Sequence, residues 1–196
     1  MQKKKASDRR AEILESARHL LISEGSRALT LRGVANAVGL KLASIQYYFP
    51  THAELIDALV ADRLEEQQTE IERLQAQTDG SSAEVLDAVL RWFTFGQNNT
   101  SGDDRLDVQL WALAQVDDSA RRALARYHDQ YVAFLAKLIR EGVGVSKQQS
   151  VGRAVAIASL LEGSILFVEL AADIAPGKKR YKDIYNSVCL IAYGAM

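Results

Sequence analysis

Between Thr30 and Pro50 the apolar side chains recur every three or four positions, in two short runs separated by Gly39. This spacing gives a helix one apolar face, so it predicts two short helices that pack against each other. Gly39 stands where the first helix must stop, because glycine adopts the left-handed conformation of a helix end without strain. Ala35 is small at the expected crossing of the two helices, so the pattern indicates a helix-turn-helix. The apolar positions are Leu31, Val34, Ala35, Val38, Leu40, Ile45 and Tyr48.

Helical spacing continues through the rest of the chain, and no segment alternates as a strand does. We expect an all-α fold of about nine helices: a three-helix DNA-binding domain over residues 1–51, then a helical ligand-binding and dimerisation domain over 52–196. The last two helices are apolar around most of their circumference, so we expect them to pair with their equivalents in a second copy of the chain. The expected helices cover about residues 8–23, 31–38, 42–49, 52–77, 82–98, 105–115, 119–141, 147–172 and 179–195. The expected core of the first three contains Ile13, Leu20, Val34, Val38, Ile45 and Phe49.

Composition supports a soluble helical protein, with 48% hydrophobic residues, 25% charged residues and two prolines. The single cysteine, Cys189, excludes an internal disulfide and a cysteine-based zinc cluster, and it fits a reducing cytoplasm. The basic N-terminus lacks the apolar stretch of a secretory signal. The apolar segment 154–168 is interrupted by Glu162 and falls short of the roughly 20 residues that span a membrane. We therefore expect a cytoplasmic protein with no membrane association, no metal and no cofactor.

Charge is unevenly distributed along the chain. Residues 1–51 carry nine basic and four acidic residues, a net charge of +5, whereas the remainder carries −6. A basic N-terminal quarter on an acidic body is typical of phosphate binding, and here it coincides with the helix-turn-helix. The Lys3–Lys5 arm either enters a minor groove or only raises general affinity for DNA.

Over about residues 8–60 the chain resembles the TetR family of transcriptional regulators. The resemblance implies an all-helical dimer that is formed through the last two long helices. It also implies an effector domain whose ligand changes the spacing of two DNA-reading heads. Three positions depart from the family pattern: Lys41 replaces a capping serine, Gln46 replaces a frequent tyrosine, and His52 replaces a common lysine. The matching residues are Thr30, Arg32, Val34, Ala35, Val38–Leu40, Ala43–Ile45, Tyr48–Pro50, Leu55 and Ile56.

The candidate DNA contacts follow from the expected geometry of the second helix of the motif, whose start meets base edges. Ile45 and Phe49 must point inward, which leaves Lys41, Ser44, Gln46 and Tyr47 on the groove face. Leu42 or Ala43 could touch a thymine methyl, and Gln46 could pair with adenine. Candidate phosphate contacts are Thr30, Arg32, Tyr48 and His52, although Tyr48 could instead pack inward.

The helical body contains many aromatic residues, which either form ordinary core or enclose a ligand pocket with a few polar groups. Glu162 is a carboxylate in apolar surroundings and needs a partner. It either pairs across a dimer interface or attracts a cationic or hydrogen-bonding effector. The candidate effector residues are Trp92, Phe95, Gln109, Trp111, Tyr127, His128, Tyr131 and Glu162.

The sequence therefore predicts a dimeric repressor that leaves a near-palindromic double-stranded operator when a small molecule binds. Its two heads would be roughly 34–36 Å apart or somewhat more. The alternative is a DNA-bound protein–protein adaptor with no small effector. An enzyme is disfavoured, because the three histidines, at positions 19, 52 and 128, show neither metal-ligand spacing nor a nucleophile–base pattern.

Overall fold

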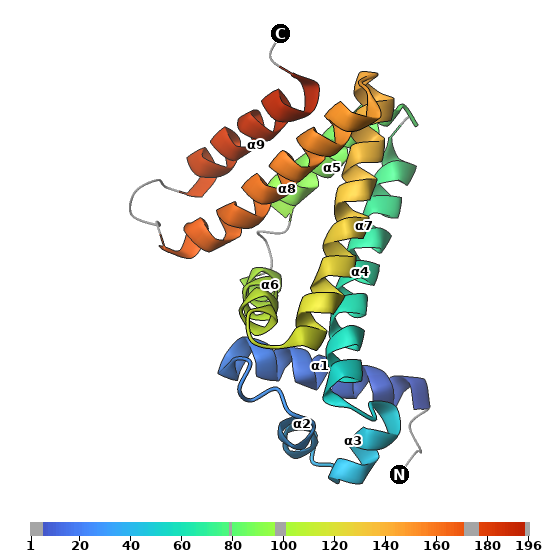
Figure 1. Cartoon of the computed structure of the whole chain (residues 1–196), viewed down its shortest axis with the longest axis vertical. Coiled ribbons are helices and arrows are strands. Elements are labelled where there is room, and N and C mark those ends of the chain that lie inside the picture. The colour runs from blue at the N-terminus through green and yellow to red at the C-terminus, as the bar shows by residue number, and fades with distance from the viewer. Residues whose placement is uncertain (1–5, 79, 97–100, 171–176, 195–196) are drawn as a thin grey trace. The chain divides into compact units, whose positions relative to one another are not determined.

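The computed structural model describes residues 6–78, 80–96, 101–170 and 177–194. Over these residues the chain forms nine α-helices and no strand, which confirms the predicted fold class (Figure 1). None of the helices in the described ranges combines the length and the apolar character that a membrane crossing requires. The helices are α1 (Ala6–Glu24), α2 (Leu31–Ala37), α3 (Leu42–Tyr48), α4 (His52–Gln77), α5 (Ser82–Arg91), α6 (Ser101–Ala114), α7 (Asp118–Val143), α8 (Lys147–Leu170) and α9 (Gly177–Tyr193).

The helices form two compact units. The first contains residues 1–65 and 105–127, and the second contains residues 66–104 and 128–196. The long helices α4 and α7 each contribute residues to both units. The functional division after residue 51 stays a prediction, since these units are defined by packing alone.

The core of the first unit joins α1, α2 and α3 with the start of α4, with α6 and with the start of α7. Ile13, Val34 and Ile45 are fully buried, and Phe49 is only 1% exposed. Val38 is half-buried and packs against this cluster. Burial of each such side chain contributes roughly 1.5–3 kcal/mol to the stability of the folded protomer. These predicted core residues pack together within one protomer.

Two glycines shape the helix-turn-helix. Gly39 has a φ of 66°, which confirms the left-handed turn between α2 and α3. A Cβ on Gly33 would lie 2.3 Å from the carbonyl oxygen of Ala28, so glycine is required there by close backbone approach. Thr30 caps α2, because its Oγ1 accepts a 2.9 Å hydrogen bond from the Gly33 N–H.

Most helix ends lie within two residues of the sequence prediction, and only the end of α5 and the start of α6 differ by more. Helix α5 ends at Arg91, whereas the sequence predicted a helix to about residue 98. The π-helical turn Trp92–Gly96 follows it directly. Helix α6 begins four residues earlier than expected, at Ser101. Helix α7 begins at Asp118, since the side chain of Asp117 accepts hydrogen bonds from the N–H groups of Ser119 and Ala120 at 2.8 and 2.9 Å.

In the second unit α9 packs alongside α8 and contacts α5 (Figure 1). The Tyr185 hydroxyl of α9 donates to Asp87 of α5, and the Arg91 guanidinium lies 4.7 Å from the centre of the Tyr185 ring. Partial burial raises the pKa of Tyr185, and the bond to Asp87 adds to the shift. Arg91 also donates to Asp87 at 2.7 Å, so α9 is held to α5 by a polar network as well as by apolar packing.

The outer face of the α8–α9 pair carries exposed apolar side chains. Val155 is 48% exposed and Leu190 is 61% exposed. On α8 a stripe of small residues, Gly152, Ala156, Ser159 and Gly163, shares one helix face at spacings of four, three and four residues. A Cβ on Gly152 or Gly163 would meet no other atom within 4 Å in the protomer.

Candidate functional site

Helix α3 has an inward face and an outward face. Ile45 is fully buried and Phe49, directly after the helix, is 1% exposed, as the sequence predicted. Tyr47 is 78% exposed, which is unusual for so large an aromatic residue. The outward surface is completed by the exposed residues Lys41, Ala43 and Gln46 and the half-buried residues Leu42, Ser44 and Tyr48.

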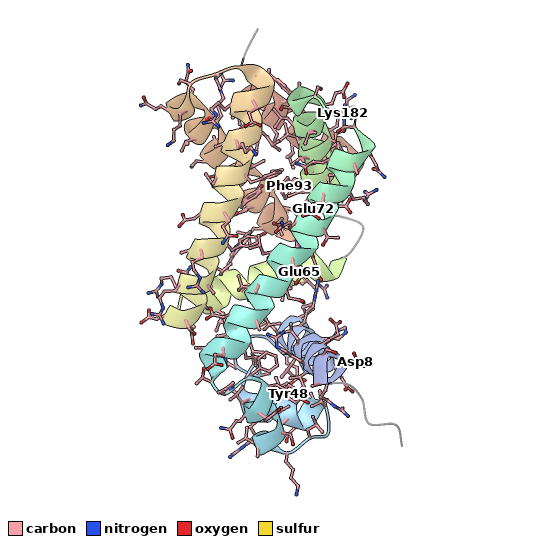
Figure 2. The ribbon with its side chains drawn as sticks, turned by 90° about the vertical axis from the view of Figure 1, so that its right-hand side faces the viewer. Asp8, Tyr48, Glu65, Glu72, Phe93 and Lys182 are labelled. Atoms are coloured by element: carbon pink, nitrogen blue, oxygen red, sulfur yellow. The ribbon has the colours of Figure 1, made fainter. Side chains whose placement is uncertain are left out.

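A shallow hollow of about 430 Å³ opens on this outward face. The rings of Tyr47 and Tyr48 meet edge to face with their centres 5.0 Å apart. Tyr48 also packs against the core of the unit, so its ring supports the exposed ring of Tyr47 from below. Figure 2 shows Tyr48 at the end of α3. The hollow is lined by Arg9, Leu40, Ala43, Ser44, Tyr47 and Tyr48.

The starts of α2 and α3 are built differently. Thr30 is exposed but its side-chain oxygen is used in the cap of α2, and Arg32 lies exposed in the first turn. Lys41 occupies the N-cap of α3 without any side-chain capping bond. Lys41 is therefore a cation at the positive end of a helix dipole, an arrangement that a phosphate would stabilise.

His52, a candidate phosphate contact, is held inside the first unit. Its Nε2 lies 2.7 Å from the carbonyl oxygen of Leu29, and its Nδ1 lies 3.8 Å from Oδ2 of Asp117. Both ring nitrogens thus face acceptors of the protein itself. Whether His52 also reaches DNA stays a prediction.

Sequence reasoning missed two arginines of α1, of which Arg9 belongs to this surface. Arg9 lines the hollow, and Arg10 places its guanidinium 4.9 Å from the centre of the Phe49 ring. The helical spacing contained a signal for Arg9, which lies one turn before the buried Ile13 and so near the face that packs on α3.

A buried ion pair between α4 and α6 was also missed. Arg63 is 4% exposed, and its Nε and Nη2 donate to the two carboxylate oxygens of Asp107 at 3.2 and 3.3 Å. This two-pronged pairing fixes both position and orientation. No local pattern predicts it, because the partners are 44 residues apart.

The candidate effector residues fall into both units. In the first, Trp111 and Tyr127 are half-buried against the core cluster, and the Gln109 side chain lies next to Gly25. These three positions therefore contribute to packing of the first unit.

In the second unit, candidate aromatic residues gather around Phe93. Its ring centre lies 4.7 Å from that of Trp92 and 5.0 Å from that of Tyr131, which is 7% exposed. Phe93 lies within this unit in Figure 2, and the π-helical turn that carries Trp92 and Phe93 is a feature often found at functional sites. Phe95 differs, because its ring packs against Tyr185 of α9 with centres 5.5 Å apart.

The polar candidates of the second unit form a pair. Nε2 of His128 lies 3.6 Å from Oε1 of Glu162, and both side chains are half-buried. Glu162 therefore has a partner within its own protomer. His128 precedes Tyr131 by three residues on α7, which places the two on the same side of the helix.

Two family models match the chain. Residues 13–59 match the N-terminal model of the bacterial regulatory proteins of the tetR family, and residues 82–182 match the C-terminal model of BetI-type transcriptional repressors. The chain belongs to the TetR family. As a TetR-family member it is a transcriptional regulator, and the helix-turn-helix described above is the DNA-binding element of that family.

The chain is also similar to a curated relative and to solved structures. The nucleoid occlusion factor SlmA of Actinobacillus pleuropneumoniae is 27% identical over 130 residues, which cover 66% of this chain and 63% of the relative. The chain thus matches less than two thirds of that relative's length. Among solved structures, a transcriptional regulator from Pseudomonas aeruginosa PAO1 has a TM-score of 0.81 at 15% identity, covering 98% of this chain and 94% of its own. A regulator from Saccharomonospora viridis in complex with choline has a TM-score of 0.72 at 19% identity, covering 93% and 96%. These likenesses concern the fold.

Proposed function

We propose that this TetR-family regulator is a cytoplasmic homodimer that represses transcription at a near-palindromic operator and leaves it when a small organic cation binds. The observation that carries the DNA-binding part is the outward face of α3. There Tyr47 is 78% exposed while Ile45 beside it is fully buried. A helix that buries one face in its own core and presents polar and aromatic groups on the other is suited to the major groove.

Selection of duplexes from a random-sequence library, followed by fluorescence anisotropy, tests this part. We expect Tyr47→Ala or Gln46→Ala to cost about 1–3 kcal/mol for each head of the dimer on the selected duplex and less on random DNA, since base contacts carry specificity. Val116→Ala is the matched control, because Val116 is 79% exposed in the same unit but lies outside α3. Failure to select any duplex at about 50 mM salt would end the DNA-binding proposal.

The dimer is supported by the outer face of α8 and α9. Small residues along one helix face permit close approach of a second helix, and Val155 and Leu190 would leave water on association. A symmetric pair would then place two heads for the two halves of a palindrome.

The effector class is supported by the chemistry of the second unit. The carboxylate of Glu162 supplies negative charge, and Phe93 and Tyr131 supply π-faces in the same unit; both kinds of group attract an organic cation. The C-terminal BetI-type match and the choline-bound Saccharomonospora viridis regulator support the same class.

Thermal unfolding with choline and with its neutral carbon isostere, 3,3-dimethylbutanol, tests the effector. We expect choline to raise Tm and the isostere to leave it unchanged, because only the cation gains from the carboxylate. Glu162→Gln should remove the choline shift. Release of DNA by choline would complete the proposal, whereas no response to any organic cation would favour the adaptor alternative.

A further inference from the structure

His52 lies where three elements of the first unit meet. It is the first residue of α4, which begins soon after α3 ends. Its ring contacts the carbonyl oxygen of Leu29, directly before the Thr30 cap of α2, at 2.7 Å. Its other nitrogen faces Asp117, the cap of α7, at 3.8 Å. One side chain thus spans both ends of the helix-turn-helix and the start of α7.

The contacts determine which ring nitrogen carries hydrogen. A carbonyl oxygen only accepts, so Nε2 donates to Leu29 and bears the hydrogen of the neutral ring. In that form Nδ1 has a lone pair directed at the Asp117 carboxylate, and no hydrogen bond forms. When the ring is protonated, Nδ1 also carries hydrogen and can donate to Asp117. The link to α7 therefore depends on a proton, while the link to Leu29 does not.

The carboxylate that faces His52 is held in its charged form. The hydroxyl of Ser119 and the N–H groups of Ala120 and Ser119 donate to Asp117 and lower the pKa of this carboxyl, and the nearby His52 adds to the effect. Asp117 is thus ionised throughout the range in which histidine titrates.

We call the contacts of His52 with Leu29 and Asp117 the joint. Other charged groups near the joint have partners other than His52. Arg121 of α7 donates to Asp118 at 2.7 Å and to the carbonyl oxygen of Ala114 at 3.2 Å. Glu54 of α4 is joined to Thr51. Farther along α4, Asp57 pairs with Arg126 at 2.7 Å. Asp117 is therefore the charged group that responds most directly to the proton on His52.

We propose that His52 is a positioning residue whose protonated form ties the helix-turn-helix to α7 through Asp117, so that operator affinity rises as pH falls. The inference rests on the proposed DNA-binding function. With the tie formed, the head starts closer to the orientation it needs on DNA, and less conformational freedom is lost on binding.

Anisotropy on the selected duplex at about pH 6 and about pH 8, at constant salt, tests the proposal. For the native chain we expect binding about three- to tenfold tighter at the lower pH, a part of the worth of one charge-assisted hydrogen bond. Asp117→Asn should remove this pH dependence, because asparagine preserves the cap of α7 but lacks the charge. His52→Gln should also remove it.

A matched histidine variant controls for general protonation. His19 lies on the same unit, exposed on α1, with Nε2 3.0 Å from Glu15. His19→Gln should therefore retain the pH dependence. If His52 acts instead by direct phosphate contact, Asp117→Asn will retain the full pH dependence, and that result overturns the proposal.

Thermal unfolding of the DNA-free protein separates the joint from the proposed function. The Tm of the native chain should exceed that of Asp117→Asn by more at about pH 6 than at about pH 8, since protonation forms the tie. If the Tm difference between the native chain and Asp117→Asn widens at low pH but the protein binds no DNA, the proposed function is wrong and the His52–Asp117 interaction is supported. A gap that does not change with pH overturns the joint.

Discussion

The two ends of this chain bury their apolar residues in different ways. In the N-terminal head, formed by α1, α2 and α3, the side chains of Ile13, Val34 and Ile45 are fully buried within one protomer. In the C-terminal helix pair, Val155 is 48% exposed and Leu190 is 61% exposed. The head completes its core within the protomer, together with α6 and the start of α7. The helix pair instead leaves an apolar face in water, where that face gains nothing from the hydrophobic effect.

The glycines of the two regions show the same difference. Gly33 of α2 is required by a backbone oxygen of its own protomer, because a Cβ there would approach Ala28 to 2.3 Å. Gly163 of α8 has no neighbour within 4 Å of the corresponding position, although glycine weakens a helix by about 1 kcal/mol relative to alanine. The neighbour that requires glycine at position 33 belongs to the same protomer. Under the proposed dimer, the neighbour that requires glycine at position 163 belongs to a second copy of the chain.

Placing a charge on the incomplete face should have the largest effect. Val155→Asp would bury an unpaired carboxylate in the proposed interface, so we expect monomers by analytical ultracentrifugation. Operator affinity should fall by on the order of a hundredfold or more, because two linked heads bind far better than one. Val116→Asp adds the same charge to a 79% exposed site in the first unit and should leave the dimer intact. A dimeric Val155→Asp variant would contradict the proposed interface.

Substituting the two glycines should sharpen the comparison with a smaller effect. Gly33→Ala should lower the free energy of unfolding by about 1–3 kcal/mol through overpacking, without changing the dimer dissociation constant. Gly163→Ala should raise that dissociation constant, because a methyl group would separate the two copies of α8. Urea unfolding and sedimentation at several protein concentrations measure both quantities. If Gly163→Ala simply stabilises the protein, as expected for an isolated helix, no second backbone packs at this stripe.

Most of the fold could be predicted from sequence because its signals are local. The Thr30 cap, the Gly39 turn and the limits of α4 are determined by neighbouring residues, and the structure confirms all three. Helix α5 was predicted too long, since an apolar helical pattern does not distinguish a regular turn from the wider π-helical turn at Trp92–Gly96.

The candidate site was less predictable because its contacts are long-range. The inward direction of Ile45 followed from helical spacing, but the pairing of Arg63 with Asp107 had no local signal. The sequence makes His52 a candidate phosphate contact at a position where the family commonly has lysine, and only the structure shows that its ring nitrogens face Leu29 and Asp117. For His52 the residue type gives the chemistry of the side chain, and only the folded chain gives its direction.

The smallest expected effect concerns the N-cap of α3, the one helix start in the helix-turn-helix that lacks a side-chain capping bond. Thr30 caps α2 with a side-chain bond, whereas Lys41 gives α3 none. Lys41→Ser should therefore stabilise the head by about 0.5–1 kcal/mol, read as a rise in Tm. The same change removes one cation beside the DNA from each head of the proposed dimer, so the slope of log K against log salt should become shallower by about 1.8, about 0.9 for each head. Lys41→Ala separates the two effects, because it loses the charge without adding a cap. If both variants keep the native slope, Lys41 does not contact phosphate, and its place at the start of α3 is neutral for DNA binding as well as unfavourable for the helix.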